Sequence, residues 1–157
     1  MTLESKARLD ATDWTILEHL QSAGRMRFAE LGRRMSLSPP AVAERVRRLE
    51  ESGVITGYTA TVDPSAVGLG IKAFIRVVTT PKTFPKMEAL SAELPEIVDC
   101  HRTTGNGCFI LKVRVRDLGH LERLLDRVMP VGEPEASVVL STAIEARSVA
   151  RPEAWSI

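Results

Sequence analysis

The sequence predicts an α+β protein: an N-terminal three-helix (winged) helix-turn-helix domain followed by a ferredoxin-like βαββαβ domain. Apolar residues recur at helical spacing up to about residue 57 and tight turns separate the runs, whereas later segments alternate helical stretches with β-branched runs. The 157 residues divide near Asp63 into residues 1–62, which include a linker strand, and residues 63–157. Each part is near the lower size limit for an independent core, so size alone favours assembly with a partner chain.

Three helices are predicted in the first domain. The first begins at an N-cap, either Asp10 or Thr12, and ends near residues 22–24. The second is short and carries one apolar stripe within residues 28–35. The third helix spans residues 40–51, and a proline pair precedes it. Because proline is favoured in the first turn of a helix, the third helix begins at this pair, which leaves only a short connection after the second helix.

The second domain is predicted from six segments in the order β-α-β-β-α-β. The strands are residues 71–80, 97–103, 108–116 and 137–144, and the helices are residues 84–94 and 118–128. Asn106-Gly107 favours a two-residue hairpin turn, which would pair Asp99 with Arg114 and Val98 with Val115. In this fold the helices cover one face of the sheet.

The other face of the sheet mixes apolar and charged residues. The apolar residues there are Phe74, Val78, Ile97 and Ile110, and they lie among Lys72, Arg76 and Arg114. Such a face is neither a clean core nor a clean solvent surface, and it is typical of a dimer interface.

Positive charge is concentrated in one short stretch. The chain carries 21 basic and 20 acidic residues, a net charge of +1, which excludes a polycation that binds nucleic acid without specificity. Between Arg25 and Arg48, however, there are seven arginines and only two acidic residues, Glu30 and Glu44. From Tyr58 onward the numbers of basic and acidic residues are equal. This stretch is the electrostatic footprint of a nucleic-acid interface.

The third helix is suited to the major groove of duplex DNA. One side carries Val42, Val46 and Leu49 and faces inward, and Ser38 or Pro39 caps the helix at its tip. The opposite side carries Ala41, Glu44, Arg45 and Arg48. Arginine binds guanine bidentately or clamps phosphates. A solvated charged face is the alternative, but it does not explain the short preceding helix, the turn, or the further phosphate candidates Arg25, Arg27, Arg33 and Arg34.

These residues resemble the Lrp/AsnC, or feast/famine, transcriptional regulators. The resemblance is carried by Leu9-Asp10, Asp13, Ile16-Leu17, Leu37-Ser38, residues 45–49, Gly53-Val54-Ile55 and Gly57-Tyr58. The second half is similar to the family's effector and assembly domain, with the Thr104-Gly105 turn. The match covers nearly the whole chain, and the order of the motifs makes it specific.

The resemblance implies a sequence-specific regulator that binds double-stranded DNA as a homodimer, assembles further into a tetramer of dimers, and senses a small-molecule effector, an amino acid. The implied DNA-binding residues, together with the two phosphate candidates where the second helix begins, are Arg25, Arg27, Ser38, Pro39, Ala41, Glu44, Arg45 and Arg48. The implied effector-binding residues are Thr103, Thr104, Gly105, Asn106, Gly107 and Cys108. The glycines and Asn106 also fit simple turn residues with positive φ.

One departure from the family concerns the effector loop. Many members carry an acidic residue at the position of Gly107 or Cys108, and this chain has none there. Either Asp99 or another carboxylate substitutes, or the ligand differs, or the site is vestigial.

Other function classes are less well supported by the sequence. No enzyme, cofactor or metal site is expected: Cys100 and His101 point to opposite faces of their strand, and only His101-Arg102 would serve a haem-precursor decarboxylase of this layout. An architectural DNA-binding protein without an effector response remains an alternative. No membrane segment or secretory signal is evident, so we expect a cytoplasmic, nucleoid-associated protein.

Overall fold

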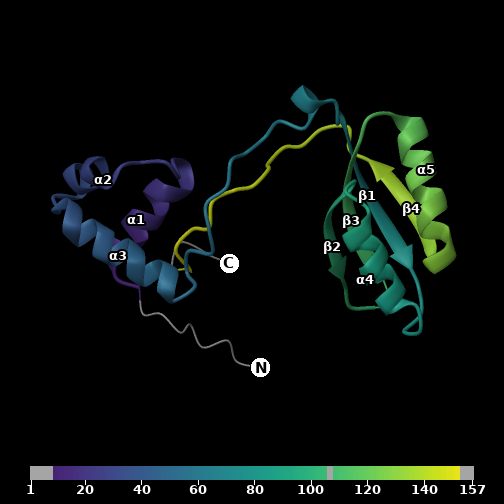
Figure 1. Cartoon of the computed structure of the whole chain (residues 1–157), viewed down its shortest axis with the longest axis horizontal. Coiled ribbons are helices and arrows are strands. Elements are labelled where there is room, and N and C mark those ends of the chain that lie inside the picture. The colour runs from purple at the N-terminus through teal and green to yellow at the C-terminus, as the bar shows by residue number, and fades with distance from the viewer. Residues whose placement is uncertain (1–8, 106–107, 153–157) are drawn as a thin grey trace. The chain divides into compact units, whose positions relative to one another are not determined.

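The computed structural model describes residues 9–105 and 108–152. Among these, residues 9–60 and 144–152 form one compact unit and residues 61–143 form a second (Figure 1). Each unit has its own apolar core. The predicted domain of residues 63–157 differs from these units in its last stretch, because residues 144–152 lie with the helical unit.

The helical unit contains α1 (Ala11–Ser22), α2 (Phe28–Met35) and α3 (Pro39–Glu51). Asp10 is the N-cap of α1, and with Asp13 it forms a reciprocal capping box: Asp13 N donates to Asp10 Oδ1 at 2.8 Å and Asp10 N donates to Asp13 Oδ2 at 3.1 Å. The prediction of Asp10 is confirmed and that of Thr12 is wrong. The core of the unit consists of Ile16, Leu17, Leu20, Leu31, Val42, Val46 and Leu49.

The turn between α2 and α3 depends on a close approach at a glycine. Ser36 adopts a left-handed conformation (φ 56°), and Leu37 N donates to Gly32 O at 2.9 Å. A Cβ on Gly32 would lie 2.5 Å from the carbonyl oxygen of Leu37, so only glycine fits this position without a shift of the turn. Ser38 then caps α3, its Oγ accepting from Ala41 N at 3.3 Å.

The predicted wing and linker strand have no counterpart after α3. Residues 54–63, all of which the structure describes, form no strand. Tyr58 instead packs back on α3, donating its hydroxyl hydrogen to Glu50 Oε1 at 2.9 Å. Burial raises the pKa of Tyr58 to about 12, so this hydroxyl stays protonated at neutral pH.

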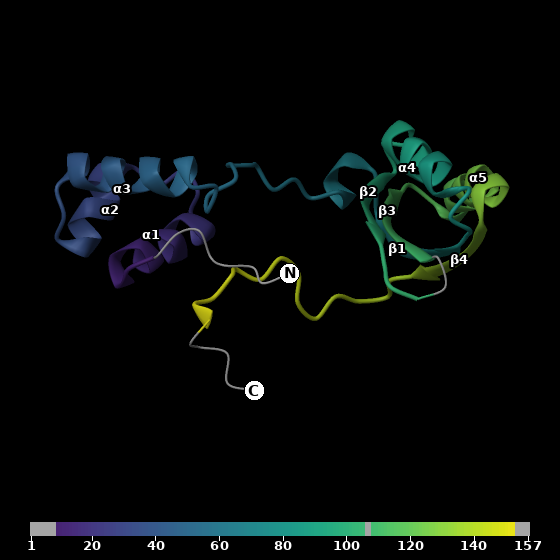
Figure 2. The same cartoon turned by 90° about the horizontal axis from the view of Figure 1, so that it is seen from below.

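The second unit is a four-stranded antiparallel sheet covered on one face by two helices, as predicted. The strands β1 (Ile71–Val78), β2 (Ile97–Arg102), β3 (Cys108–Val115) and β4 (Glu133–Val138) lie in the order β2-β3-β1-β4. Figure 2 shows α4 (Phe84–Glu93) and α5 (Leu118–Val128) on the same side of the sheet. Short 3₁₀ turns occupy Ser65–Val67 and Met129–Val131. The buried apolar side chains between sheet and helices include Ala73, Ile75, Val77, Met87, Phe109, Leu111, Val113, Val115, Leu124 and Val128.

The pairing of β2 with β3 differs from the predicted register by two residues. Asp99 faces Lys112 instead of Arg114, and Thr103 N donates to Cys108 O at 2.9 Å, so four residues separate the paired ends of the hairpin. The predicted two-residue turn at Asn106-Gly107 lies outside the described residues. Because side chains alternate with period two, a shift of two keeps the residues of β2 from Asp99 onward on their predicted faces. Ile97, predicted on the open face, instead packs against the core.

Two further strand predictions are wrong. Val98 lies in a bulge of β2 and is 47% exposed, so it does not face Val115 in the core. The last strand is Glu133–Val138 rather than residues 137–144, and Leu140 is 96% exposed. The apolar run after Ser137 suggested a strand, but β4 is an edge strand, where proline and acidic residues are tolerated.

Among the described residues, no helix is long and apolar enough to cross a bilayer.

Candidate nucleic-acid interface and effector loop

The outer side of α3 carries the residues predicted to contact DNA. Val42, Val46 and Leu49 are buried against the other two helices, which turns the opposite side of α3 outward. Ser38 and Pro39 are exposed at the tip of the helix, Ala41 is half-buried, and Glu44 and Arg48 are exposed. The tip of α3 therefore combines a helix N-terminus with a small side chain, a surface that admits close approach of a phosphate or a base edge.

Arg45 is placed differently from the other arginines of α3. Its Nη1 donates to Asp10 Oδ2 and to Asp13 Oδ1, both at 2.7 Å. The side chain is 25% exposed, and Asp13 as a residue is 7% exposed. This cluster lowers the pKa of Asp10, first through the backbone N–H of Asp13 and then through the Arg45 guanidinium. Arg45 thus joins α3 to the first turn of α1.

Only one part of this cluster is visible in the sequence. The spacing of Asp10 and Asp13 before an apolar run is the signature of a capping box, and that signal is visible in the sequence. The pairing with Arg45 is not, because more than thirty residues separate the partners and only the packing of α3 against α1 brings them together.

Arg47 pairs with acidic residues of its own helix. Its guanidinium donates to Glu44 at 2.7 Å and also to Glu51, and it lowers the pKa of Glu44. All three side chains are more than half exposed, so these pairs add little stability and are readily exchanged. Arg48 has no ion pair within the described part of the chain.

The arginines around α2 are also exposed. Arg25 and Arg27 precede α2, and Arg27 occupies its N-cap position without a capping side-chain bond. Arg34 is held by Glu30 at 2.7 Å, whereas Arg33 has no ion pair with another described residue. Cations that are not neutralised within the unit are available to phosphates.

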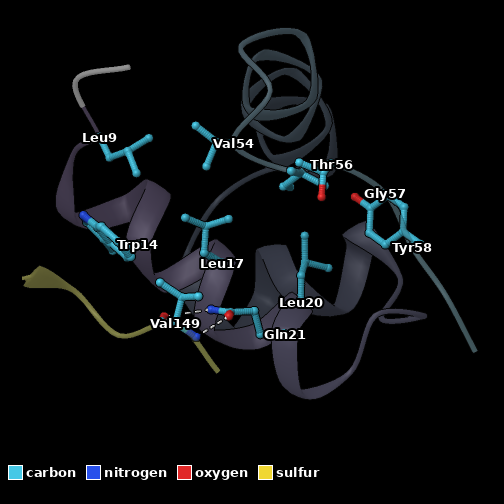
Figure 3. Close-up of a pocket in the computed structure, with 11 residues that line it drawn as sticks. Leu9, Trp14, Leu17, Leu20, Gln21, Val54, Thr56, Gly57, Tyr58 and Val149 are labelled. Atoms are coloured by element: carbon cyan, nitrogen blue, oxygen red, sulfur yellow. Dashed lines mark hydrogen bonds between the residues drawn. The ribbon is translucent and has the colours of Figure 1, made fainter. Parts of the chain in front are cut away.

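An apolar pocket of about 310 Å³ opens beside α1 (Figure 3). Its lining residues are Leu9, Trp14, Leu17, Leu20, Gln21, Val54, Ile55, Thr56, Gly57, Tyr58 and Val149. The Gln21 carboxamide bonds both backbone groups of Val149: Val149 N donates to Oε1 at 2.7 Å and Nε2 donates to Val149 O at 3.1 Å. Arg151 lies over the ring of Trp14 at 5.9 Å from its centroid. The C-terminal stretch is therefore part of the helical unit.

The predicted effector loop joins β2 to β3. The backbone N–H and the Oγ1 of Thr103 both donate to Cys108 O, at 2.9 and 3.1 Å. Thr104 and Gly105 are exposed, and Gly105 has φ +106°, a conformation that favours glycine. Asn106 and Gly107 lie outside the described residues. Asp99, the candidate replacement for the missing acidic residue, is paired with Lys112 at 3.2 Å.

The open face of the sheet carries apolar and charged groups together, as predicted. Phe74 is 43% exposed beside Ile110, and Arg76 pairs with Glu135 at 2.9 Å. Together with Ser137 these residues line a shallow hollow of about 410 Å³. Cys108 points to this face and Cys100 to the helices, where Ser91 Oγ donates to its sulfur. Among the described residues no cluster of three or more His, Cys, Asp or Glu could hold a metal ion.

Comparisons with known proteins match both units. A model of the AsnC-type helix-turn-helix domain matches residues 9–50, and a model of the Lrp/AsnC ligand binding domain matches residues 72–149. An HTH-type transcriptional regulator of Mycobacterium tuberculosis, Rv2324, is 40% identical over 88% of this chain and 96% of its own length. The leucine-responsive regulatory protein of Escherichia coli is 36% identical over 81% and 82%. The crystal structure of the Neisseria meningitidis regulator NMB0573 in complex with L-Met superposes with a TM-score of 0.87, at 30% identity over 94% of this chain and 100% of that one.

Proposed function

The chain belongs to the Lrp/AsnC family of transcriptional regulators, and from this premise we propose that α3 reads duplex DNA while the β2–β3 loop senses an amino acid. The observation that carries the proposal is the outer side of α3. It presents a helix N-terminus, a small residue and an arginine with no ion pair in the described chain, all on one surface.

Base recognition is assigned to the residues on that surface. Arg48 binds guanine or a phosphate, and Ala41 lets the helix approach the base edges. Ser38 accepts from Ala41 N through its oxygen, so its hydroxyl hydrogen remains available to a phosphate, and Pro39 packs beside it. Glu44 exchanges Arg47 for a cytosine amino group in the complex.

Phosphate contacts are assigned to Arg25 and Arg27. Both are exposed and precede α2. Neither pairs with the acidic residues that bind Arg45 and Arg47. Such contacts position the helix on the duplex and make binding depend on salt.

The proposed effector is an amino acid held by the β2–β3 loop, with Thr103, Thr104, Gly105, Asn106, Gly107 and Cys108 around it. Exposed backbone N–H groups suit the carboxylate. Asp99 is paired with Lys112, so the ammonium group either replaces Lys112 at Asp99 or binds backbone carbonyls of the loop or a carboxylate of a second subunit. The L-Met complex of the Neisseria regulator supports this ligand class.

The proposed assembly is a homodimer formed through the open face of the sheet, with further association into a tetramer of dimers. Phe74 and Ile110 supply apolar area, and Arg76 and Glu135 supply self-complementary charges. The chain then acts in the cytoplasm, on nucleoid DNA, as a regulator and not as an enzyme.

An architectural DNA-binding role without an effector is the second candidate, favoured by the absence of an acidic residue in the loop. Two measurements separate the candidates. DNA protection with genomic fragments should yield discrete sites for a regulator and continuous coverage for an architectural protein. Calorimetry against the twenty amino acids should give binding for a regulator; if no amino acid binds, effector sensing is wrong.

The DNA interface is tested by salt titration of the affinity. Arg48→Ala should weaken binding to a protected fragment and, where the contact is a phosphate, reduce the slope of log affinity against log salt by about 0.9. Arg123→Ala, which removes an exposed arginine from α5 of the sheet unit, is the matched control and should leave affinity and slope unchanged.

A further inference from the structure

We propose that Arg45 is a positioning residue and not a DNA contact: it fixes α3 on the N-terminus of α1 and thereby directs the face of α3 that meets DNA. This inference rests on the proposed function of α3, and it departs from the direct contact that the sequence predicts for Arg45.

The hydrogen bonds of the cluster hold Arg45 in place. Asp10 Oδ1 accepts from Asp13 N, and Asp13 Oδ2 accepts from Asp10 N. The remaining oxygen of each carboxylate accepts from Nη1 of Arg45. Arg45 and the capping box together thus satisfy all four carboxylate oxygens, and a guanidinium that turned away to DNA would leave one oxygen of each residue without its donor.

The charges of the cluster also keep Arg45 at Asp10 and Asp13. Two carboxylates face one guanidinium, so the cluster carries a net negative charge even with Arg45 in place. Release of Arg45 would leave the buried Asp13 without a cation. A buried charge that loses its partner is strongly destabilised, whereas an exposed pair is cheaply exchanged. Arg47, in its exposed pairs, is free to rearrange on DNA, and Arg45 is not.

The position of Arg45 along α3 links it to the residues proposed to contact DNA. Ala41 and Arg48 lie four residues before it and three residues after it, which places all three side chains on one side of α3. A contact that fixes the rotation of α3 at Arg45 therefore also fixes the direction of Ala41 and Arg48. Positioning through a rigid element of this kind is how a supporting residue holds a binding surface in place.

The test compares three variants of the full chain on one protected DNA fragment. Arg45→Met removes the guanidinium and keeps an unbranched apolar stem. Asp13→Asn keeps a hydrogen-bond acceptor for Asp10 N but removes the charge that holds Arg45. Arg48→Met is the matched variant for a residue that does contact DNA. For each variant, affinity is measured across a salt series and thermal unfolding is followed in parallel.

A positioning role predicts a roughly tenfold loss of affinity for both Arg45→Met and Asp13→Asn, with the salt slope of the wild type and a lowered Tm. Arg48→Met should keep the wild-type Tm. A direct phosphate contact predicts the reverse: Arg45→Met would flatten the slope by about 0.9, and Asp13→Asn, which frees Arg45, would tighten binding. Either of these two results overturns the inference.

The outcomes also distinguish the inference from the proposed function. If the wild-type chain shows no salt-dependent binding to DNA, the proposed function fails. If the wild type binds and Arg45→Met behaves like a contact residue, only the inference fails. Should Arg45→Met fail to fold, Asp13→Asn decides, because the sign of its effect on affinity differs between the two roles.

Discussion

Arg45 Nη1 lies 2.7 Å from Oδ1 of Asp13, the one buried charged residue among those that the structure describes. This contact divides the arginines of α3 into three kinds. Arg45 is paired with Asp10 and with the buried Asp13, Arg47 is held in exchangeable surface pairs, and Arg48 has no ion pair within the described chain. The basic stretch of the sequence is therefore not one uniform patch, and its net charge overstates the number of cations available to DNA.

Removal of the Asp13 carboxylate should destabilise the helical unit. Asp13→Ala deletes both a capping acceptor and the partner of Arg45, which is partly buried, so we expect a loss of about 1–3 kcal/mol in the free energy of unfolding. Urea denaturation followed by far-UV circular dichroism at 222 nm measures it. Glu51→Ala, which breaks only an exposed pair with Arg47, should change stability by less than about 0.5 kcal/mol; equal effects of the two variants would contradict this assignment.

Gly32→Ala should disturb the turn before α3. The new Cβ would lie 2.5 Å from the carbonyl oxygen of Leu37, so the turn must open at a cost of about 1–3 kcal/mol. Ser38, the N-cap of α3, directly follows Leu37, so a shift of the Leu37 carbonyl also moves the tip of α3. DNA affinity should therefore fall together with stability. The control is Gly24→Ala, whose Cβ meets its nearest neighbour at an ordinary 3.6 Å. A Gly32→Ala variant with wild-type Tm and affinity would show that the turn accommodates a Cβ at this position.

Local signals in the sequence predicted much of the fold. Asp10 and Ser38 were each among the predicted helix N-caps, because each precedes an apolar run at helical spacing, and each does accept a hydrogen bond from the first turn of its helix. Beyond the bulge at Val98, the strand faces followed from alternation alone, which is why even the wrong register left Asp99 on its predicted face.

What could not be predicted depends on contacts between distant segments. The edge strand β4 is defined by pairing with β1, including Arg76 opposite Glu135, and its own residues resemble a loop. The pairing of Arg45 with Asp10 and Asp13 requires the packed arrangement of α1 and α3. The exposure of Val98 results from a bulge in β2, and no pattern in the sequence marks this bulge.

The sheet unit should lose stability in acid through Glu96. Its Oε1 lies 2.8 Å from His120 Nε2, and this hydrogen bond is the largest cause of a lowered pKa of the Glu96 carboxyl. A carboxyl with a depressed folded-state pKa stabilises the protein above its unfolded value of 4.5, and the contribution is lost as pH falls through the lowered value.

Glu96→Gln should therefore flatten the dependence of stability on pH below about 5, as measured by urea denaturation followed by circular dichroism at each pH. The control is Glu122→Gln, an exposed carboxyl on α5, which should leave that profile as in the wild type. A Glu96→Gln profile that still coincides with the wild type below pH 5 would rule out this role.

The C-terminal stretch should detach when Gln21 loses its carboxamide. Gln21→Ala removes both hydrogen bonds to the backbone of Val149, so we expect about 1 kcal/mol less stability and faster proteolysis within residues 144–152. Gln21→Glu retains the acceptor for Val149 N but loses the donor, and should fall between the wild type and Gln21→Ala. If the cleavage rate of Gln21→Ala matches that of the wild type, this contact does not hold the stretch in solution.

Phe74→Asp should dissociate the proposed dimer without unfolding the sheet unit. Phe74 is 43% exposed on the open face of β1, opposite Lys112, so its replacement removes no core contact but puts a carboxylate in place of the apolar ring in the proposed interface. Light scattering after size exclusion should give the mass of one chain, and DNA affinity should fall because one half-site is bound instead of two. Leu118→Asp is the matched control: Leu118 is 63% exposed at the start of α5, on the helical side of the sheet, and its replacement should keep the wild-type mass. A Phe74→Asp protein that keeps the wild-type mass, with a folded circular dichroism spectrum, would place the subunit interface elsewhere.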